Sequence, residues 1–148
     1  MRAPSSTLVL DAAILISAAF GRSAGAIRRA GETADLVTTD RVLHEARRRI
    51  ELGLKQPDLL ELLDALAEAI TVVPVAALEP LLASCEVTLR DAVASRNGST
   101  ADAHVLALAW WADADVWTTD RDFAGTGVAA WSTPNLMRGL AQAARDHA

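Results

Sequence analysis

The sequence predicts an α/β fold in which a parallel sheet is sandwiched between helices. Short apolar or β-branched runs recur along the chain, and segments with apolar residues at helical spacing separate them. Parallel strands need long crossover connections, which the intervening helices supply.

Each predicted strand is a short apolar or β-branched run. Residues 7–10 form an apolar run that ends at Asp11, and residues 71–75 are rich in valine and end near Pro74. The other strands follow from the same pattern. The expected strands are 7–10, 35–38, 71–75, 115–118 and 128–131.

The helices are predicted from apolar spacing and from the residues that begin and end them. Gly21 and Gly31 end the first two helices, Asp40 is expected to cap the third, and Ser99 or Thr100 is expected to cap a strongly apolar one. The expected helices are 12–20, 24–30, 42–54, 59–70, 78–94, 101–112 and one that opens at Pro134.

Length and composition favour one globular domain over residues 1–148. Hydrophobic residues make up 51% of the 148 residues and charged residues 22%, which is enough to bury a core without a disulfide. Cys85 is the single cysteine, which fits a reducing cytoplasm. We expect no signal peptide, and the apolar runs fall short of the roughly 18 residues that a membrane span needs.

The net charge of −5 does not favour nucleic-acid binding, but the charge is unevenly distributed. Residues 58–91 hold seven acids and one base, which leaves 13 of the 14 bases and 12 of the 19 acids for the rest of the chain. Arginines gather in the first third of the chain. The run from Arg47 to Arg49 is either a solvated helix face or a phosphate-binding surface.

Two acids follow strands directly, Asp11 after residues 8–10 and Asp120 after residues 116–119. Sites in open α/β sheets form beyond the carboxyl ends of the strands, where the strand order reverses. If these strands are neighbours, they lie about 4.8 Å apart and both carboxylates face one small volume. A hard divalent cation is the usual partner of such a pair.

Three more acids are expected near the carboxyl ends of the same strands. Asp102 lies at the start of its helix, Glu45 lies on the helix after the second strand, and Asp122 follows Asp120 by two residues. Each has an ordinary structural reading. A helix dipole favours Asp102, Glu45 is spaced to pair with Arg41 or Arg49, and Asp120 is placed to cap a short helix.

Four segments carry a resemblance to a known family. They are Val9-Leu10-Asp11, the helix with Glu45, Ala101-Asp102-Ala103-His104-Val105-Leu106-Ala107-Leu108-Ala109, and Trp117-Thr118-Thr119-Asp120-Arg121-Asp122-Phe123. They are similar to the motifs of PIN-domain ribonucleases, and more narrowly to VapC-like toxins of bacterial toxin–antitoxin pairs. The resemblance implies a single PIN-like domain with a parallel sheet of about five strands and helices on both faces.

The resemblance also implies metal-dependent endonucleolytic cleavage of RNA with Mg²⁺ or Mn²⁺, by the toxin of a type II system. It assigns the catalytic roles to Asp11, Glu45, Asp102 and Asp120. Metal binding is expected from Asp11, Asp102, Asp120 and Asp122, and RNA contacts from Arg47, Arg48, Thr118 and Arg121. Glu45 is expected to orient or deprotonate the attacking water. One position departs from the family, since Ala13 stands where an asparagine is frequent.

The resemblance implies partners as well. Toxins of this family are held inactive by a small antitoxin, which we expect to dock on the apolar helices 12–20 and 24–30. Homodimers are also common. Tryptophans 110 and 111 cannot share one helix face, so one is expected in the core and the other at a partner surface. We expect Cys85 and His104 to have packing roles.

Two rival functions stay open from the residues alone. One is a different metal-dependent enzyme, either a phosphatase or a nuclease acting on DNA flaps. A phosphatase with an aspartyl nucleophile would need a second acid two residues after Asp11, where Ala13 stands. The other rival is a PIN-like module that binds RNA or protein without cutting.

Overall fold

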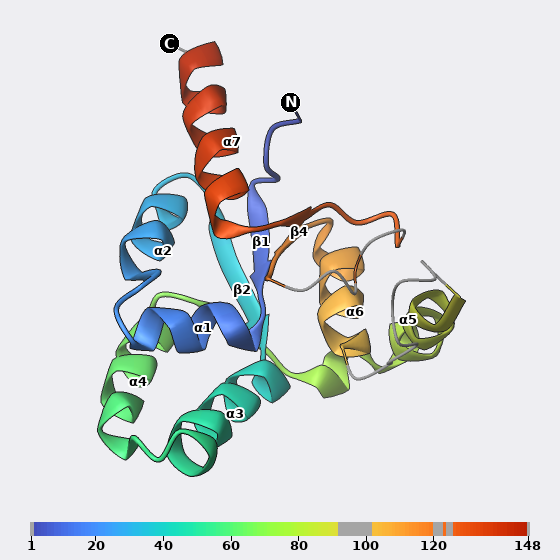
Figure 1. Ribbon diagram of the computed structural model, residues 1–148. Helices are drawn as coiled ribbons and strands as arrows, with labels where there is room; N and C mark the ends of the chain where they lie inside the picture. Colours follow the sequence, from blue (N-terminus) through green and yellow to red (C-terminus); the bar gives the residue numbers. More distant parts are fainter. Residues whose placement is uncertain (1, 92–101, 120–122, 124–125, 148) are drawn as a thin grey trace.

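The computed structural model describes residues 2–91, 102–119, 123 and 126–147. Its described strands form one parallel sheet in the order β3-β2-β1-β4-β5 (Figure 1). The predicted fold class is therefore confirmed. The strands are β1 (Thr7–Leu10), β2 (Asp35–Thr39), β3 (Thr71–Val73), β4 (Asp115–Trp117) and β5 (Ala130–Trp131).

Helices connect these strands and cover both faces of the sheet. In Figure 1, α1, α2 and α4 lie to one side of the strands, and α5 and α6 lie to the other. The α-helices are α1 (Ala12–Ala19), α2 (Ala24–Gly31), α3 (Asp40–Arg48), α4 (Leu60–Glu68), α5 (Glu79–Asp91), α6 (Ala103–Ala112) and α7 (Thr133–Asp146). Shorter turns are the π-helical η1 (Arg49–Gly53) and the 3₁₀ turns η2 (Pro57–Leu59) and η3 (Val75–Leu78).

The central strand β1 is buried from both sides. Leu8, Val9 and Leu10 have no exposed surface, because helices cover both faces of a parallel sheet. Helix α6 is buried over most of its length, from Ala103 to Ala109, which explains its almost continuously apolar sequence.

The strand order reverses between β1 and β4. From β1 the chain adds β2 and β3 on one side, and it later adds β4 and β5 on the other. Leu10 pairs with Trp117, and the Asp11 N–H donates to the Trp117 carbonyl over 3.3 Å. The two strands expected to be neighbours are therefore adjacent, and Asp11 lies where ligands bind in open α/β sheets.

At the amino end of β4, the buried Asp115 holds the N-terminal segment. Its Oδ2 accepts from the Arg2 guanidinium, the Ser5 N–H and the Trp131 Nε1–H, each over 2.9 Å. Because Asp115 is only 3% exposed, these bonds offset the cost of burying its charge.

Several element ends differ from the expectations, among them ends of α3, α4 and α6. Asp40 does not cap α3: Thr39 is the N-cap, its hydroxyl accepts from the Val42 N–H over 3.0 Å, and Asp40 instead accepts from the Val75 N–H over 2.9 Å. Helix α4 ends at Glu68, two residues before the expected end. Helix α6 begins at Ala103 with Asp102 as its N-cap, and the expected caps Ser99 and Thr100 lie outside the described residues.

Cys85 is fully buried, and burial with the nearby Glu86 charge raises its pKa to about 11. Trp111 is 62% exposed whereas Trp110 is partly buried, as their helical spacing predicts. Across the described ranges, no helix has the length and apolar character needed to cross a bilayer.

Candidate active site

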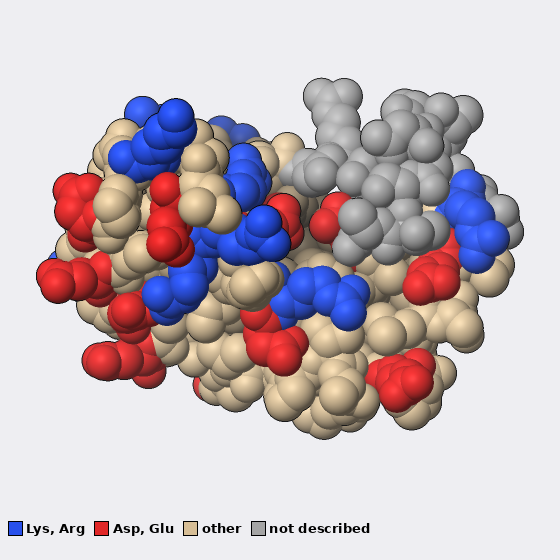
Figure 2. All heavy atoms as spheres, turned by 90° about the horizontal axis from the view of Figure 1, so that it is seen from below, with Lys and Arg blue, Asp and Glu red and all other residues tan. Residues whose placement is uncertain are grey.

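A cavity of about 470 Å³ lies at the carboxyl end of β1. Seen from below in Figure 2, acidic side chains lie in a hollow with basic side chains beside it. The cavity brings together three of the predicted acids from three different elements. Its lining residues are Asp11, Ala12, Ala13, Val42, Glu45, Arg49, Asp102, Val105 and Thr119.

Hydrogen bonds from the Ile14 N–H and the Thr118 hydroxyl help to hold Asp11 in place. As the N-cap of α1 it accepts from the Ile14 N–H at Oδ1 over 3.1 Å. Its Oδ2 accepts from the hydroxyl of Thr118. Together these bonds fix the orientation of the carboxylate at the end of β1.

Thr118 follows β4 and is 3% exposed. Its hydroxyl, for which we expected an RNA contact, donates to Asp11, 107 residues earlier in the chain. The adjacency of β1 and β4 produces this contact, because both residues directly follow the ends of the paired strands. Its place suggests a positioning role.

Glu45 and Asp102 reach the cavity from two helices. Glu45 lies on α3 and is exposed, and Asp102 is partly buried at the N-terminus of α6. The Asp102 carbonyl accepts from the N–H groups of Val105 and Leu106, and the helix dipole favours its negative charge.

The donor set suits a hard cation, since Mg²⁺ is commonly bound by one or two carboxylates with water completing its shell. Within the described part of the chain, however, no three His, Cys, Asp or Glu side chains form a group that could hold a metal ion. The predicted ligands Asp120 and Asp122 lie outside the described residues. Asp11, Glu45 and Asp102 therefore surround the cavity without converging on one point.

The predicted RNA-binding arginines have different surroundings. Arg47 forms an ion pair with Asp64 of α4, and Arg48 is exposed. Arg121 lies outside the described residues. Arg49, which we did not select as a site residue, lines the cavity. Its spacing of four residues from Glu45 is the signal that could have identified it.

His104 lies beneath the site as a buried, neutral side chain. Its Nδ1 is 2.8 Å from the Thr39 hydroxyl, and 2% of the residue is exposed. Burial and the nearby Arg41 charge lower its pKa to about 4, although Asp40 acts in the other direction. The packing role expected from the sequence agrees with this environment.

The parallel sheet with an acid-lined cavity at its switch point defines a class of α/β proteins whose sites lie at the strand ends. Within that class, this chain belongs to the PIN domain family, which matches residues 9–141. No curated protein sequence matches the chain.

Two solved structures share the fold. A protein from Pyrobaculum aerophilum is 17% identical with a TM-score of 0.63, and the match covers 92% of this chain and 96% of that one. A toxin–antitoxin complex from Klebsiella pneumoniae contains a chain that is 20% identical with a TM-score of 0.56, and this match covers 85% and 97%.

Proposed function

We propose that this chain is a metal-dependent endoribonuclease and the toxin of a type II toxin–antitoxin pair. The observation that carries the proposal is the cavity at the strand switch point, which collects Asp11, Glu45 and Asp102 in a member of the PIN domain family. The toxin assignment is supported by the likeness to a chain of the Klebsiella pneumoniae toxin–antitoxin complex.

We assign each acid the role expected from the sequence. Asp11 and Asp102, with Asp120, hold one or two Mg²⁺ or Mn²⁺ ions, and Asp122 assists. A bound ion would supply Lewis-acid chemistry, because it would lower the pKa of a water and offset negative charge on the phosphoryl oxygens. Glu45, exposed on α3, orients or deprotonates the attacking water. Cleavage leaves 5′-phosphate and 3′-hydroxyl ends.

The test is cleavage of RNA by purified variants in the presence of Mn²⁺. Asp11→Asn and Asp120→Asn each remove one negative charge with little change of shape, and we expect each to lower the cleavage rate at least about a hundredfold. Asp58→Asn is the matched control, because Asp58 is exposed in the 3₁₀ turn η2. Undiminished cleavage by both site variants would overturn the assignment.

The rival is a PIN-like module that binds without cutting, which Ala13 at the cavity favours because alanine offers no ligand or hydrogen bond. Calorimetric titration with Mn²⁺ separates the two. The nuclease binds the ion at millimolar concentration and loses affinity in Asp11→Asn, whereas the module shows no binding.

An apolar groove supports the proposed antitoxin partner. A hollow of about 710 Å³ lies between α1, α2 and α4, and its lining is almost entirely apolar, including Phe20, Ile27, Leu62 and Leu66. Such grooves accept the apolar face of an amphipathic helix. We propose that an antitoxin segment of this kind occupies it, which places the partner on the two helices expected from the sequence and on α4.

A further inference from the structure

Arg49 is the one cation among the described residues that line the acidic cavity. The three acids beside it, Asp11, Glu45 and Asp102, repel the phosphodiester that the proposed nuclease must bind. A positive side chain at the rim reduces this repulsion and raises the local concentration of an anionic substrate.

The backbone fixes the place of Arg49. Its N–H donates to the Glu45 carbonyl, so the two side chains lie one turn apart on the same helix face. The chain then continues as the π-helical turn η1, in which the Leu54 N–H donates to the Arg49 carbonyl over 2.8 Å. Ile50 is fully buried and holds the turn against the core. Such π-helical turns frequently occur at functional sites.

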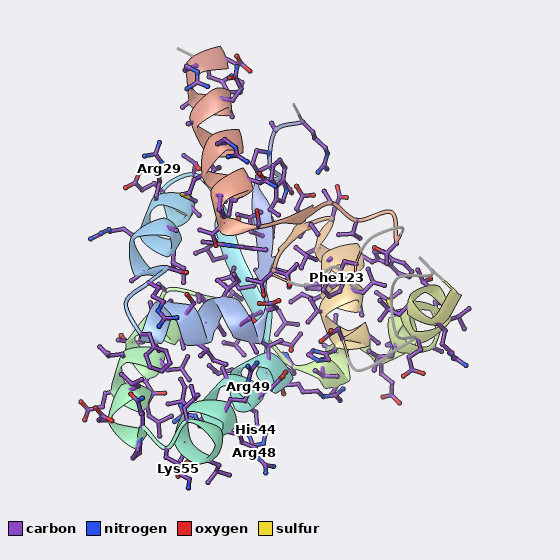
Figure 3. All side chains as sticks on the ribbon, in the orientation of Figure 1. Arg29, His44, Arg48, Arg49, Lys55 and Phe123 are labelled. Atoms are coloured by element: carbon purple, nitrogen blue, oxygen red, sulfur yellow. The ribbon has the colours of Figure 1, made fainter. Side chains whose placement is uncertain are left out.

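The guanidinium of Arg49 is not used in an ion pair within the described ranges. The ion pairs found there are Arg2 with Asp115 and Arg47 with Asp64. Figure 3 shows Arg49 on the side of α3 toward the strands, whereas His44 and Arg48 extend from the side away from them. Arg49 therefore has a charge that is available to a ligand in the cavity.

We propose that Arg49 binds a phosphate of the RNA strand lying in the cavity. Its planar guanidinium can donate two parallel hydrogen bonds to one phosphate, which a lysine cannot reproduce. This inference rests on the proposed nuclease function for the identity of the ligand. Arg49 belongs to the arginine run at 47–49, but the expected RNA contacts were assigned to Arg47 and Arg48 within that run.

The experiment measures binding of a fluorescein-labelled single-stranded RNA by anisotropy, over a series of KCl concentrations with Mg²⁺. All variants are made in an Asp11→Asn background, so that cleavage does not interfere. We expect Arg49→Ala to weaken binding about tenfold or more. The slope of log affinity against log salt should fall by about 0.7, the value for one phosphate contact on a single strand.

Two further variants make the result specific. Arg49→Lys keeps the charge, so we expect it to retain the salt slope while losing part of the affinity. Arg29→Ala removes a charge from α2, away from the cavity in Figure 3, and should change neither quantity. Thermal melting of each variant establishes that the fold is intact, and Arg49→Lys remains informative if Arg49→Ala melts early.

The outcomes separate this proposal from the nuclease function. If Arg49→Ala binds RNA as tightly as Arg29→Ala does, Arg49 does not bind phosphate. The nuclease function is tested separately, by RNA cleavage with the unsubstituted chain. If the unsubstituted chain cuts no RNA but Arg49→Ala shows the expected loss of RNA affinity, the nuclease function fails and the phosphate contact stands. If the Asp11→Asn parent does not bind RNA, the Arg49 proposal is overturned.

Discussion

The hydroxyl of Thr118 joins two strand ends that are far apart in sequence. By donating to Asp11 it fixes one carboxylate oxygen, while the Ile14 N–H fixes the other. Groups that orient a metal-binding carboxylate in this way contribute to affinity and rate without touching the substrate. A threonine that sequence patterns place beside the site thus has a defined structural task.

Replacing Thr118 tests this task. We expect Thr118→Val, which keeps the shape and removes the donor, to lower kcat for RNA cleavage and Mn²⁺ affinity by about 10- to 100-fold. Thr118→Ser keeps the donor and should stay close to the unsubstituted chain. Equal losses in both variants, measured by steady-state kinetics and calorimetry, would indicate a packing role instead.

His104 predicts a pH dependence of stability. Its pKa is about 4 in the folded chain against an ordinary 6.5, so the unfolded chain binds the proton first as the pH falls. The free energy of unfolding should therefore decrease between pH 6.5 and 4, by about 3 kcal/mol in total. Above pH 6.5 both states are neutral and the effect vanishes.

Urea denaturation at several pH values measures this dependence. His104→Asn should flatten the slope between pH 6.5 and 4 relative to the unsubstituted chain. His44→Gln is the matched control, because that side chain is exposed on α3. An unchanged slope in His104→Asn would contradict the assignment.

Among the elements, α7 has Gly139 at the point where it packs against the N-terminal segment. A Cβ added at Gly139 would lie 3.1 Å from Pro4 Cγ and from Trp131 Cζ3. Trp131 is itself held by Asp115, so the helix, β5 and residues 2–5 pack as one unit. The close approach explains a glycine inside a helix, where it otherwise costs stability.

Two alanine substitutions should therefore have opposite signs. Gly139→Ala should destabilise the fold by about 1 kcal/mol, because overpacking outweighs the gain in helix propensity. Gly25→Ala in α2 meets only the flexible end of Arg28 at 3.7 Å and should stabilise by about 0.5–1 kcal/mol. Chemical denaturation of both variants checks the difference, and a stabilised Gly139→Ala would contradict the packing argument.

In the whole molecule, short-range patterns predicted most elements but not the contacts between them. The strand at 7–10 and the helix after it were predictable, because apolar runs and end signals are local. The cap of α3 was not, because Asp40 has a partner in Val75, 35 residues away. The Thr118–Asp11 bond depends on strand order, which no local pattern specifies.

The cavity and the apolar groove lie at opposite ends of α1. Asp11 precedes the helix, whereas Ala18 to Gly21 at its other end line the groove. An eight-residue helix separates the two sites by about 12 Å. A substitution in the groove should therefore change partner binding without changing catalysis.

Leu62→Asp tests this separation, because Leu62 lines the groove and is 53% exposed. Burying the new aspartate charge should weaken binding of the proposed antitoxin at least about tenfold, while RNA cleavage stays unchanged. Leu52→Asp is the control, since Leu52 is 60% exposed and lies outside the groove. Equal antitoxin affinity in the two variants, measured by calorimetry, would exclude the groove as the docking surface.

The buried Cys85 has a practical consequence for following these events in solution. It is the single thiol of the chain, and its raised pKa and lack of exposure keep it from reacting with maleimides at neutral pH. One cysteine introduced at an exposed position outside the groove, such as Leu52→Cys, would then carry a fluorophore alone. Docking at the groove and turnover at the cavity become separately observable in the same molecule.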